Sequence, residues 1–200
     1  MSTTRDRGSS RKLTSRRSFR TCPSHVRNLI EFLYLTGWRT SEALRLLWSD
    51  VDWKRRTVWL RDSKNREPRI FPFKYHARLE EVLRRQRDLV SDWERKETRL
   101  CPAVFHWRGK PMQKLRRSWK SACRAAGMSD RFVHDFRRTA VRNLIRAGVQ
   151  QAIAMKITGH KTSSIFRRYL IVDEELLAQA TGAVAHYLEE SRNAESSPAD

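Results

Sequence analysis

Apolar residues recur at helical spacing along most of the chain. Val26, Leu29, Ile30 and Leu33 fall on one stripe, which ends at Gly37. Spacings of three and four residues place these side chains on one helix face, and glycine commonly follows the last turn. The same pattern predicts further helices, namely one from Thr40 or Ser41 through Leu47, then 76–96, 112–126, about 134–147, about 149–157, about 163–170, and a last helix whose stripe is Leu176, Ala180, Val184 and Leu188.

One stretch between the second and third helices has a different pattern. Residues 51–53, 57–60 and 69–71 are short runs rich in β-branched, aromatic and other apolar residues, separated by charged turns. Such runs favour strands. The sequence therefore predicts a mainly α fold with a small three-stranded antiparallel sheet, an α+β domain.

The charge balance indicates a class of partner. The 200 residues include 42 Lys and Arg against 22 Asp and Glu, a formal net charge of +20. A polyanion would relieve this self-repulsion, and nucleic acid is the first candidate. Because 39% of the residues are hydrophobic and 10% aromatic, the charge belongs to a chain that can fold.

The two ends of the chain are polar. Residues 1–20 hold seven Lys and Arg against one Asp, which predicts a disordered basic arm. Such an arm could contact phosphates or remain solvated, and basicity alone does not decide between these. Residues 191–200 predict a polar, frayed tail. We expect one folded domain over residues 21–190.

Cysteines and apolar runs argue against other classes of protein. Cys22, Cys101 and Cys123 are far apart and form no C-x-x-C pair, which argues against a disulfide framework and a structural zinc site. The longest apolar stretch, 29–35, is short and interrupted by Glu31, so we expect neither a membrane span nor a secretory signal. A cytoplasmic protein is expected, nucleoid-associated if bacterial.

Three segments carry residue types suited to phosphate chemistry. Residues 36–42 read TGWRTSE, residues 134–137 read HDFR, and residues 159–160 read GH, with Tyr169 nine positions after the histidine. Order and spacing resemble the tyrosine recombinase (phage integrase) family, whose motifs are T-G-x-R-x-x-E, H-x-x-R, G-H and a later Tyr. The resemblance covers about residues 22–190 and implies that family's catalytic-domain fold. Four motifs in order are far more specific than any one of them.

The resemblance implies an enzyme that breaks and rejoins DNA strands without a cofactor or metal. Tyr169 would be the nucleophile that displaces a deoxyribose 5′-oxygen and conserves the bond energy as a phosphotyrosine. Arg39 and Arg137 would clamp the nonbridging phosphate oxygens, because planar guanidinium groups match phosphate geometry. His160 would add a third donor.

Family roles also imply the groups that move protons. Lys64, in the sequence Asp-Ser-Lys-Asn between two predicted strands, corresponds best to the family's β-turn lysine and would be the general acid, although Lys54 and Lys74 also flank strands. His134 would accept a proton or hydrogen-bond within the site. Glu42, one helical turn after the first arginine, would hold that arginine's orientation.

Each assignment has a simpler competitor. Arg39 could be an ordinary surface or phosphate contact, His134 a helix cap and His160 a turn residue; the functional interpretation depends on their partners. Of the other tyrosines, Tyr34 and Tyr187 lie in predicted helices and are expected to pack.

Two departures from the family pattern stand out. Position 158 is Thr where an aliphatic residue is usual before Gly-His, which we expect to loosen local packing. In addition, only about 20 residues precede the catalytic domain, where the family usually has a separate helical DNA-binding domain. A fragment, a truncated product and a stand-alone catalytic domain all remain open.

The expected function is therefore site-specific DNA recombination through a 3′-phosphotyrosyl intermediate. A type IB topoisomerase, which shares this chemistry, and a noncatalytic DNA-binding remnant are the alternatives. The expected partners are double-stranded DNA, further copies of the chain in a tetramer on DNA, and accessory DNA-bending or directionality proteins. The last helix would dock on a neighbouring protomer or pack on its own domain.

Overall fold

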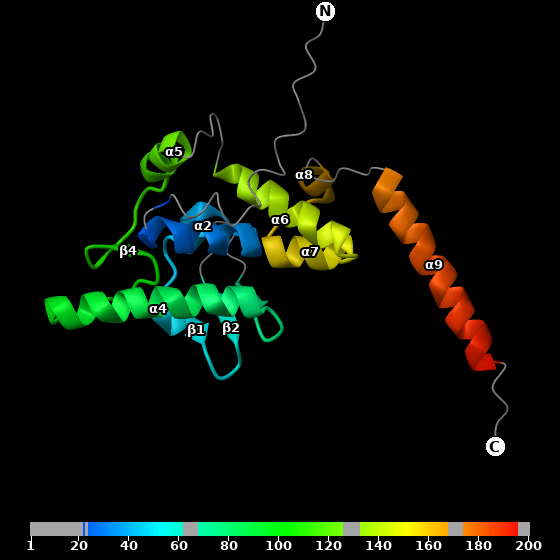
Figure 1. Cartoon of the computed structure of the whole chain (residues 1–200), viewed down its shortest axis with the longest axis horizontal. Coiled ribbons are helices and arrows are strands. Elements are labelled where there is room, and N and C mark those ends of the chain that lie inside the picture. The colour runs from blue at the N-terminus through cyan, green and yellow to red at the C-terminus, as the bar shows by residue number, and fades with distance from the viewer. Residues whose placement is uncertain (1–21, 23, 62–67, 126–132, 168–173, 196–200) are drawn as a thin grey trace, which may run out of the picture.

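Helix α2 (Ser24–Thr36) is the central element of the body. In this computed structural model, which describes residues 22, 24–61, 68–125, 133–167 and 174–195, α2 packs against α4 (Ala77–Glu97) and α6 (His134–Arg146) (Figure 1). Its side chains Leu29 and Ile30 are completely buried. Fully burying one such side chain stabilises the fold by about 1.5–3 kcal/mol, so the predicted apolar stripe is also the centre of the core.

The predicted three-stranded sheet is confirmed. Strands β1 (Val51–Asp52), β2 (Thr57–Leu60) and β3 (Arg69–Pro72) are antiparallel and lie in the order β1-β2-β3 within the described residues. Val58 of β2 pairs with Phe71 of β3, and both side chains join the main core cluster with residues of α4. One face of the sheet is thus covered by a helix.

The predicted second helix is wrong after its first turn. Helix α3 spans only Thr40–Ala43, and the 3-10 helix η2 (Trp48–Asp50) follows. Leu46 accepts a hydrogen bond from the backbone N–H of Val104, so the chain here runs beside a distant segment instead of coiling. Leu47, expected on the apolar side, is 37% exposed.

The predicted helix over 112–126 begins later, because residues 112–115 are the irregular continuation of a β-hairpin that the sequence analysis missed, and the backbone N–H of Met112 donates to the Phe105 carbonyl. Strands β4 (His106–Trp107) and β5 (Lys110–Pro111) pair around a turn in which Arg108 and Gly109 have φ of 50° and 75°. Helix α5 therefore spans Arg116–Ala125. A two-residue turn with positive φ at both positions is typical of tight hairpins.

The last part of the chain divides into two short helices beside the body and one long helix away from it. Helices α7 (Gln151–Thr158) and α8 (Ser163–Arg167) lie next to α6, whereas α9 (Glu174–Glu195) stands apart (Figure 1). The α9 side chains Leu177, Val184, Tyr187 and Leu188 are between 57% and 67% exposed. The expectation that Tyr187 packs is therefore wrong for this structure, as is packing of the final helix on its own domain.

Candidate active site

Two helix ends meet at the candidate site, and each is followed by a glycine. Gly37 after α2 and Gly159 after α7 have φ of 65° and 70°, the left-handed region that favours glycine. A Cβ on Gly37 would lie 2.9 Å from Cβ of Ala140 and 3.1 Å from Cγ2 of Thr158. Glycine therefore lets the end of α2 approach α6 and α7 closely.

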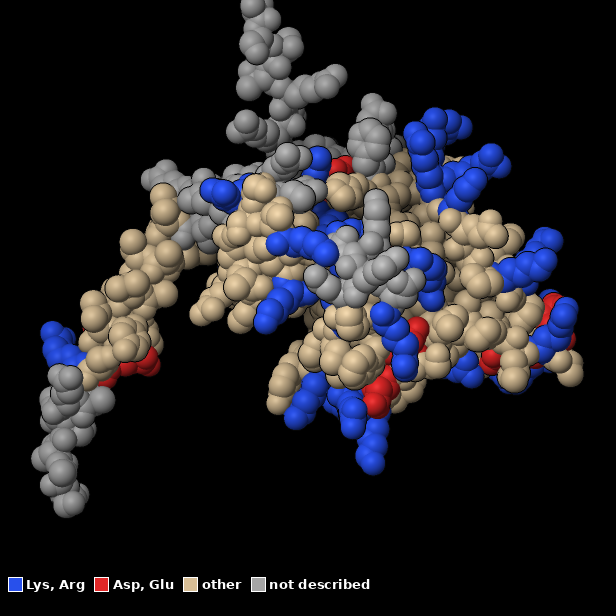
Figure 2. Space-filling model, turned by 180° about the vertical axis from the view of Figure 1, so that it is seen from behind, with Lys and Arg blue, Asp and Glu red and all other residues tan. Residues whose placement is uncertain are grey.

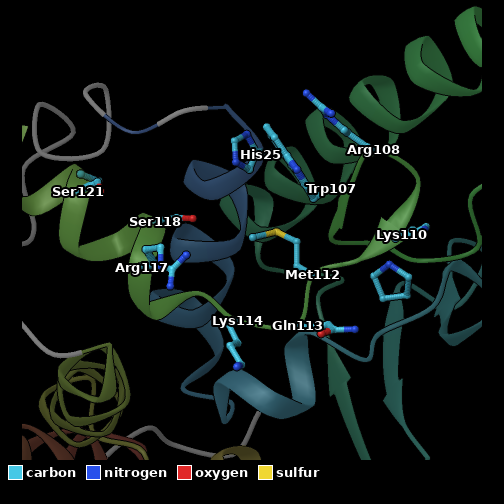
Figure 3. Close-up of a pocket in the computed structure, with 12 residues that line it drawn as sticks. His25, Trp107, Arg108, Lys110, Met112, Gln113, Lys114, Arg117, Ser118 and Ser121 are labelled. Atoms are coloured by element: carbon cyan, nitrogen blue, oxygen red, sulfur yellow. The ribbon is translucent and has the colours of Figure 1, made fainter.

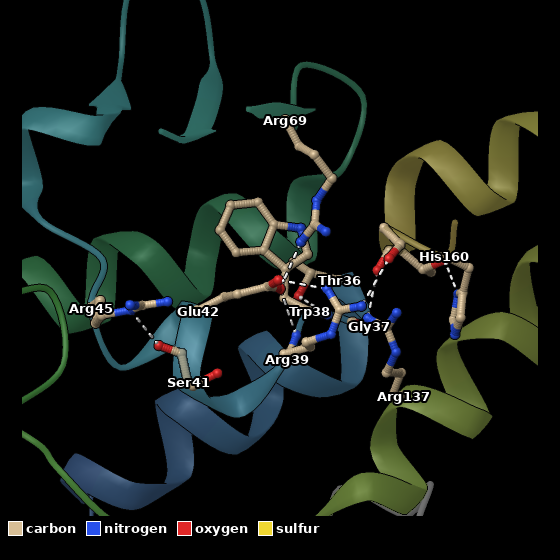
Figure 4. A network of polar contacts seen from close by, with 12 residues as sticks. Thr36, Gly37, Trp38, Arg39, Ser41, Glu42, Arg45, Arg69, Arg137 and His160 are labelled. Carbon is tan, nitrogen blue, oxygen red and sulfur yellow. Dashed lines mark hydrogen bonds and ion pairs between the residues drawn. The ribbon is translucent and has the colours of Figure 1, made fainter. Parts of the chain in front are cut away.

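Arg39 immediately precedes α3 and lies between these two helix ends (Figure 4). Its Nη1 donates to Oε1 of Glu42 at 2.8 Å, and its Nη2 donates to the Gly159 carbonyl at 3.2 Å. The Arg39 side chain remains 27% exposed, while that of Glu42 is fully buried. The carboxylate thus holds this arginine from the protein side.

A second arginine, Arg69 of β3, binds the same carboxylate and was missed by the sequence analysis. Its Nη2 donates to Oε2 of Glu42 at 2.6 Å, and its guanidinium carbon lies 5.5 Å from the centre of the Trp38 ring. The side chain is 10% exposed. Nothing in the sequence separates this arginine from the other basic residues, because the contact joins segments 27 residues apart.

Glu42 stays ionised between these two groups. Burial raises the pKa of its carboxyl, but the charge of Arg69 and hydrogen bonds from the Arg39 backbone and both guanidinium groups lower it, and the net pKa lies below its usual range. A buried carboxylate that accepts several charged hydrogen bonds is a stable anchor for arginine side chains.

Arg137, the second predicted clamp residue, comes from the first turn of α6. Its Nη1 donates to the Gly37 carbonyl at 2.7 Å and also to the Thr158 carbonyl (Figure 4). The residue is only 4% exposed. Both arginines therefore bind carbonyl groups at the helix ends, since Arg39 binds that of Gly159 after α7, and Arg137 binds those of Gly37 after α2 and Thr158 at the end of α7.

His160 is held by the residue that departs from the family pattern. The Thr158 hydroxyl donates to the Ala154 carbonyl at 2.7 Å and lies 2.7 Å from Nδ1 of His160. Because the hydroxyl has one proton, the imidazole must supply the proton of the second bond, so Nδ1 carries hydrogen. Thr158 is fully buried, and the expected loosening of packing is not seen.

The charges around His160 keep its ring neutral. Burial, followed by the positive charges of Arg137 and Arg39, lowers its pKa to about 3. Burial and Arg137 also lower the pKa of His134, the first residue of α6, with a smaller contribution from Arg39. The four predicted catalytic residues that the structure describes, Arg39, His134, Arg137 and His160, thus belong to one electrostatic neighbourhood.

Two predicted site residues, Lys64 and Tyr169, lie outside the described residues. Lys64 falls in the sequence between β2 and β3, and Tyr169 falls between α8 and α9. Of the alternative lysines, Lys54 falls between β1 and β2, and Lys74 follows β3, where its Nζ lies 5.2 Å from the centre of the Tyr75 ring. The choice among the three lysines stays a prediction.

A basic hollow of about 920 Å³ lies apart from the arginine cluster, between the start of α2, the β4–β5 hairpin and α5 (Figure 3). Arg108, Lys110, Lys114 and Arg117 line it, and the ring of Trp107 lies 4.5 Å from that of His25. Basic groups around an aromatic pair suit a sugar-phosphate backbone. The sequence analysis had identified no residues of such a surface.

The described residues contain neither a cluster of metal ligands nor a membrane-spanning helix. No group of three or more His, Cys, Asp or Glu side chains is placed to hold a metal ion. No helix in the described ranges is long and apolar enough to cross a membrane.

Comparisons with known sequences agree on one family. A family model described as "Phage integrase family" matches residues 14–175. The integrase of Salmonella phage P22 is 25% identical over 154 residues, which are 74% of this chain and 39% of that protein. Tyrosine recombinase XerC of Corynebacterium glutamicum is 27% identical over 152 residues, 76% of this chain and 48% of that protein. The chain spans less than half the length of these curated relatives.

Solved structures share the fold. A crystal structure of XerA recombinase matches with a TM-score of 0.66 and 17% identity, over 92% of this chain and 65% of that one. A lambda integrase (75–356) dimer bound to a COC′ core site matches with a TM-score of 0.65 and 18% identity, over 84% of this chain and 60% of that one.

Proposed function

The chain belongs to the phage integrase family, and from that premise we propose that it is the catalytic part of a site-specific DNA recombinase. It would cut and rejoin DNA strands through a 3′-phosphotyrosyl intermediate. One observation carries this proposal. Arg39, Arg137 and His160, from three separate segments, converge where two helix ends meet, and both arginines bind carbonyl groups of those helix ends.

The cluster suits a phosphodiester in its transition state. Negative charge grows on the nonbridging oxygens during in-line attack, and guanidinium groups already held in place stabilise it without reorganising. Arg39 and Arg137 are held by a carboxylate and by carbonyl groups before DNA arrives. Fixed donors aimed at one phosphate account for rate enhancement better than mobile surface arginines would.

The proposed step conserves atoms and energy. The Tyr169 oxygen forms a bond to phosphorus while the bond to the 5′-oxygen breaks, and the phenolic proton passes to His134 or another acceptor in the site. Lys64 protonates the leaving 5′-oxygen. The reverse step, with a different 5′-hydroxyl as nucleophile, rejoins the strands.

His160 changes its role with the charge beside it. In the described structure Nδ1 donates to Thr158, and the neutral ring leaves Nε2 as an acceptor. A phosphate anion next to the ring favours the protonated form, which donates from both nitrogens. We propose that the phosphate of bound DNA favours protonation of His160, and that the protonated ring is then the third donor.

The wider surface would hold the duplex. Figure 2 shows Lys and Arg side chains over much of one face of the body, with acidic side chains at a few places. Together with the basic hollow at α5, they would neutralise backbone phosphates. Such an enzyme would act where DNA is, in the cytoplasm or on the nucleoid of a bacterial cell.

Assembly on DNA is part of the proposal. One solved relative is a lambda integrase tetramer bound to a Holliday junction. The exposed apolar side chains of α9, which include Leu177, Val184 and Leu188, would be covered by a neighbouring protomer in a tetramer of this chain.

Covalent capture tests the function. The protein is incubated at low salt, without metal, with pre-nicked duplexes that carry a randomised segment, and adducts are resolved on a denaturing gel and sequenced. We expect a 3′-linked adduct at Tyr169, and a Tyr169→Phe protein that binds DNA equally well but forms none. An adduct in this variant, or strict dependence on magnesium, contradicts the mechanism. DNA binding without any adduct in the native protein indicates a noncatalytic remnant.

A further inference from the structure

Glu42 lies between two guanidinium groups, although one would satisfy its charge. Arg39 approaches Oε1 and Arg69 approaches Oε2, at 2.8 and 2.6 Å (Figure 4). The carboxylate is fully buried, where an ionised group needs a close counter-charge. Two cations and one anion leave the trio with one net positive charge.

The two arginines are not equivalent. The Arg69 side chain is 10% exposed, while that of Arg39 is 27% exposed. The more buried arginine therefore compensates the carboxylate from inside the fold. The more exposed one can be shared with an anion that arrives from solvent.

Arg69 is also fixed by the second helix end. A Cβ on Gly159 would lie 1.5 Å from Nη1 of Arg69, so the guanidinium occupies the space that a glycine leaves open. Its other face covers the Trp38 ring. Among the described residues its buried Nε has no hydrogen-bond partner. Hydrogen bonding alone therefore does not explain where the guanidinium lies.

We propose that Arg69 is a positioning residue that compensates the charge of Glu42, so that Arg39 keeps its positive charge for the scissile phosphate. Without Arg69, the buried carboxylate and Arg39 form a neutral pair, and the clamp loses one charge. This inference rests on the proposed function for its meaning in catalysis. The charge relation itself concerns only residues described here.

The test is a charge-balance series in the full chain. Arg69→Gln removes the compensating charge, and Glu42→Gln/Arg69→Gln removes the carboxylate as well, which returns one positive charge to Arg39. With a pre-nicked duplex recovered by covalent capture, we expect Arg69→Gln to slow single-turnover cleavage about a hundredfold and to change DNA affinity less than twofold. The double variant should be about tenfold faster than Arg69→Gln alone.

A merely structural role predicts the opposite order. If Arg69 only packs between Trp38 and Gly159, removal of a second buried partner cannot restore the rate, and a double variant no faster than Arg69→Gln overturns the proposal. Arg69→Lys, which keeps the charge but not the fork, should fall between the native protein and Arg69→Gln. Arg55→Gln on the exposed β1–β2 turn is the matched control for loss of one charge, and thermal melting checks folding.

A second readout does not need catalysis. Inorganic phosphate is titrated into each variant, and its binding is followed through the imidazole NMR signals of His160. The expected order of affinity is native protein, double variant, then Arg69→Gln, with the last about tenfold weaker than native. Equal affinities overturn the inference. If the three proteins bind phosphate in this order but the native protein forms no adduct with DNA, only the proposed function is contradicted.

Discussion

The two arginines that are proposed to bind phosphate are held by different means. At the end of α2, a charged network of Glu42 and Arg69 holds Arg39, which stays partly exposed. Neutral carbonyl groups hold Arg137, one from Gly37 after α2 and one from Thr158 at the end of α7, and this arginine is 4% exposed. A threonine hydroxyl orients the neighbouring His160. We call the Arg39 arrangement, with its ion pairs, the charged end of the site, and the Arg137 and His160 arrangement, whose described hydrogen bonds go to uncharged groups, the neutral end.

The difference teaches how two similar roles can respond to different conditions. Ion pairs around a carboxylate weaken when acid protonates it, whereas hydrogen bonds to carbonyls do not titrate. Neutral hydrogen bonds are directional, and a buried carbonyl that loses its donor costs free energy. The two ends should therefore be separable by mutation and by pH.

The largest effect is expected at the neutral end. Arg137→Ala removes a clamp charge and leaves the carbonyls of Gly37 and Thr158 without this donor, so cleavage should fall about a thousandfold and the free energy of unfolding by about 3 kcal/mol. Single-turnover cleavage and urea unfolding measure the two. Arg138→Gln, an exposed neighbour paired with Asp135, is the control and should change either little. A stable, active Arg137→Ala protein would contradict the assignment of Arg137 to the active site.

At the charged end, Glu42→Gln should lower the free energy of unfolding at pH 7 by about 3 kcal/mol and slow cleavage about tenfold, because both arginines lose their anchor. The folded-state pKa of Glu42 lies below its ordinary value, so its stabilisation is present above pH 4.5 and is lost as pH falls through the folded pKa. The difference in unfolding free energy between the native protein and the variant should thus narrow in urea unfolding as pH falls below 4.5. A difference that stays constant below pH 4.5 would show that packing, not charge, holds this end.

Between pH 7 and pH 5, His160 at the neutral end should make stability depend on pH, whereas Glu42 at the charged end should not. The pKa of His160 falls from 6.5 to about 3 on folding, so its ring contributes full stability above pH 6.5 and loses it as pH drops toward 3. From pH 7 to 5 the native protein should lose about 2 kcal/mol more than His160→Gln. Glu42→Gln, as control, should follow the native protein over this range. Parallel curves for the native protein and His160→Gln would contradict the buried neutral imidazole.

The smallest effect is expected at Thr158. Thr158→Val keeps the shape but removes the hydroxyl beside Nδ1 of His160, so stability should fall by about 1 kcal/mol and both neutral tautomers should appear. Long-range ¹H–¹⁵N NMR of the imidazole reports the tautomer directly. Thr158→Ser should behave as the native protein. A single Nδ1-protonated form in the valine variant would mean that another group fixes the ring.

The sequence predicted the parts of the fold that repeat. The stripes of α2, α4 and α6 and the runs of β1 to β3 could be recognised because burial of one face leaves a periodic signal. The early end of α3 could not be recognised, because Leu46 is held by a backbone bond to Val104, and the pattern of nearby residues does not encode distant pairing. The β4–β5 hairpin has a local sequence signal, the glycine of the Arg108–Gly109 turn, but it was not predicted.

The residues of the candidate site that belong to the family's sequence motifs were predictable, and the others were not. Arg39, Glu42, Arg137 and His160 were identified from spacing and lie together. Arg69 was not identified, because its contacts with Glu42 and Gly159 arise from the fold and its residue type is common in this chain. The hydroxyl of Thr158 was interpreted as a packing defect, since its hydrogen bond depends on where the imidazole lies.

The surplus of positive charge at the two helix ends also has a consequence for handling the protein. A site in which Glu42 binds both Arg39 and Arg69, and in which Arg137 lies close enough to lower the pKa of His160, favours any multivalent anion that binds the folded state and not the unfolded chain. Such an anion raises the free energy of unfolding by about 2.7 kcal/mol when its concentration is a hundred times its dissociation constant, and the melting temperature rises accordingly. We therefore expect sulfate or phosphate in the buffer to stabilise this fold, so that stabilities measured in different salts should not be compared directly.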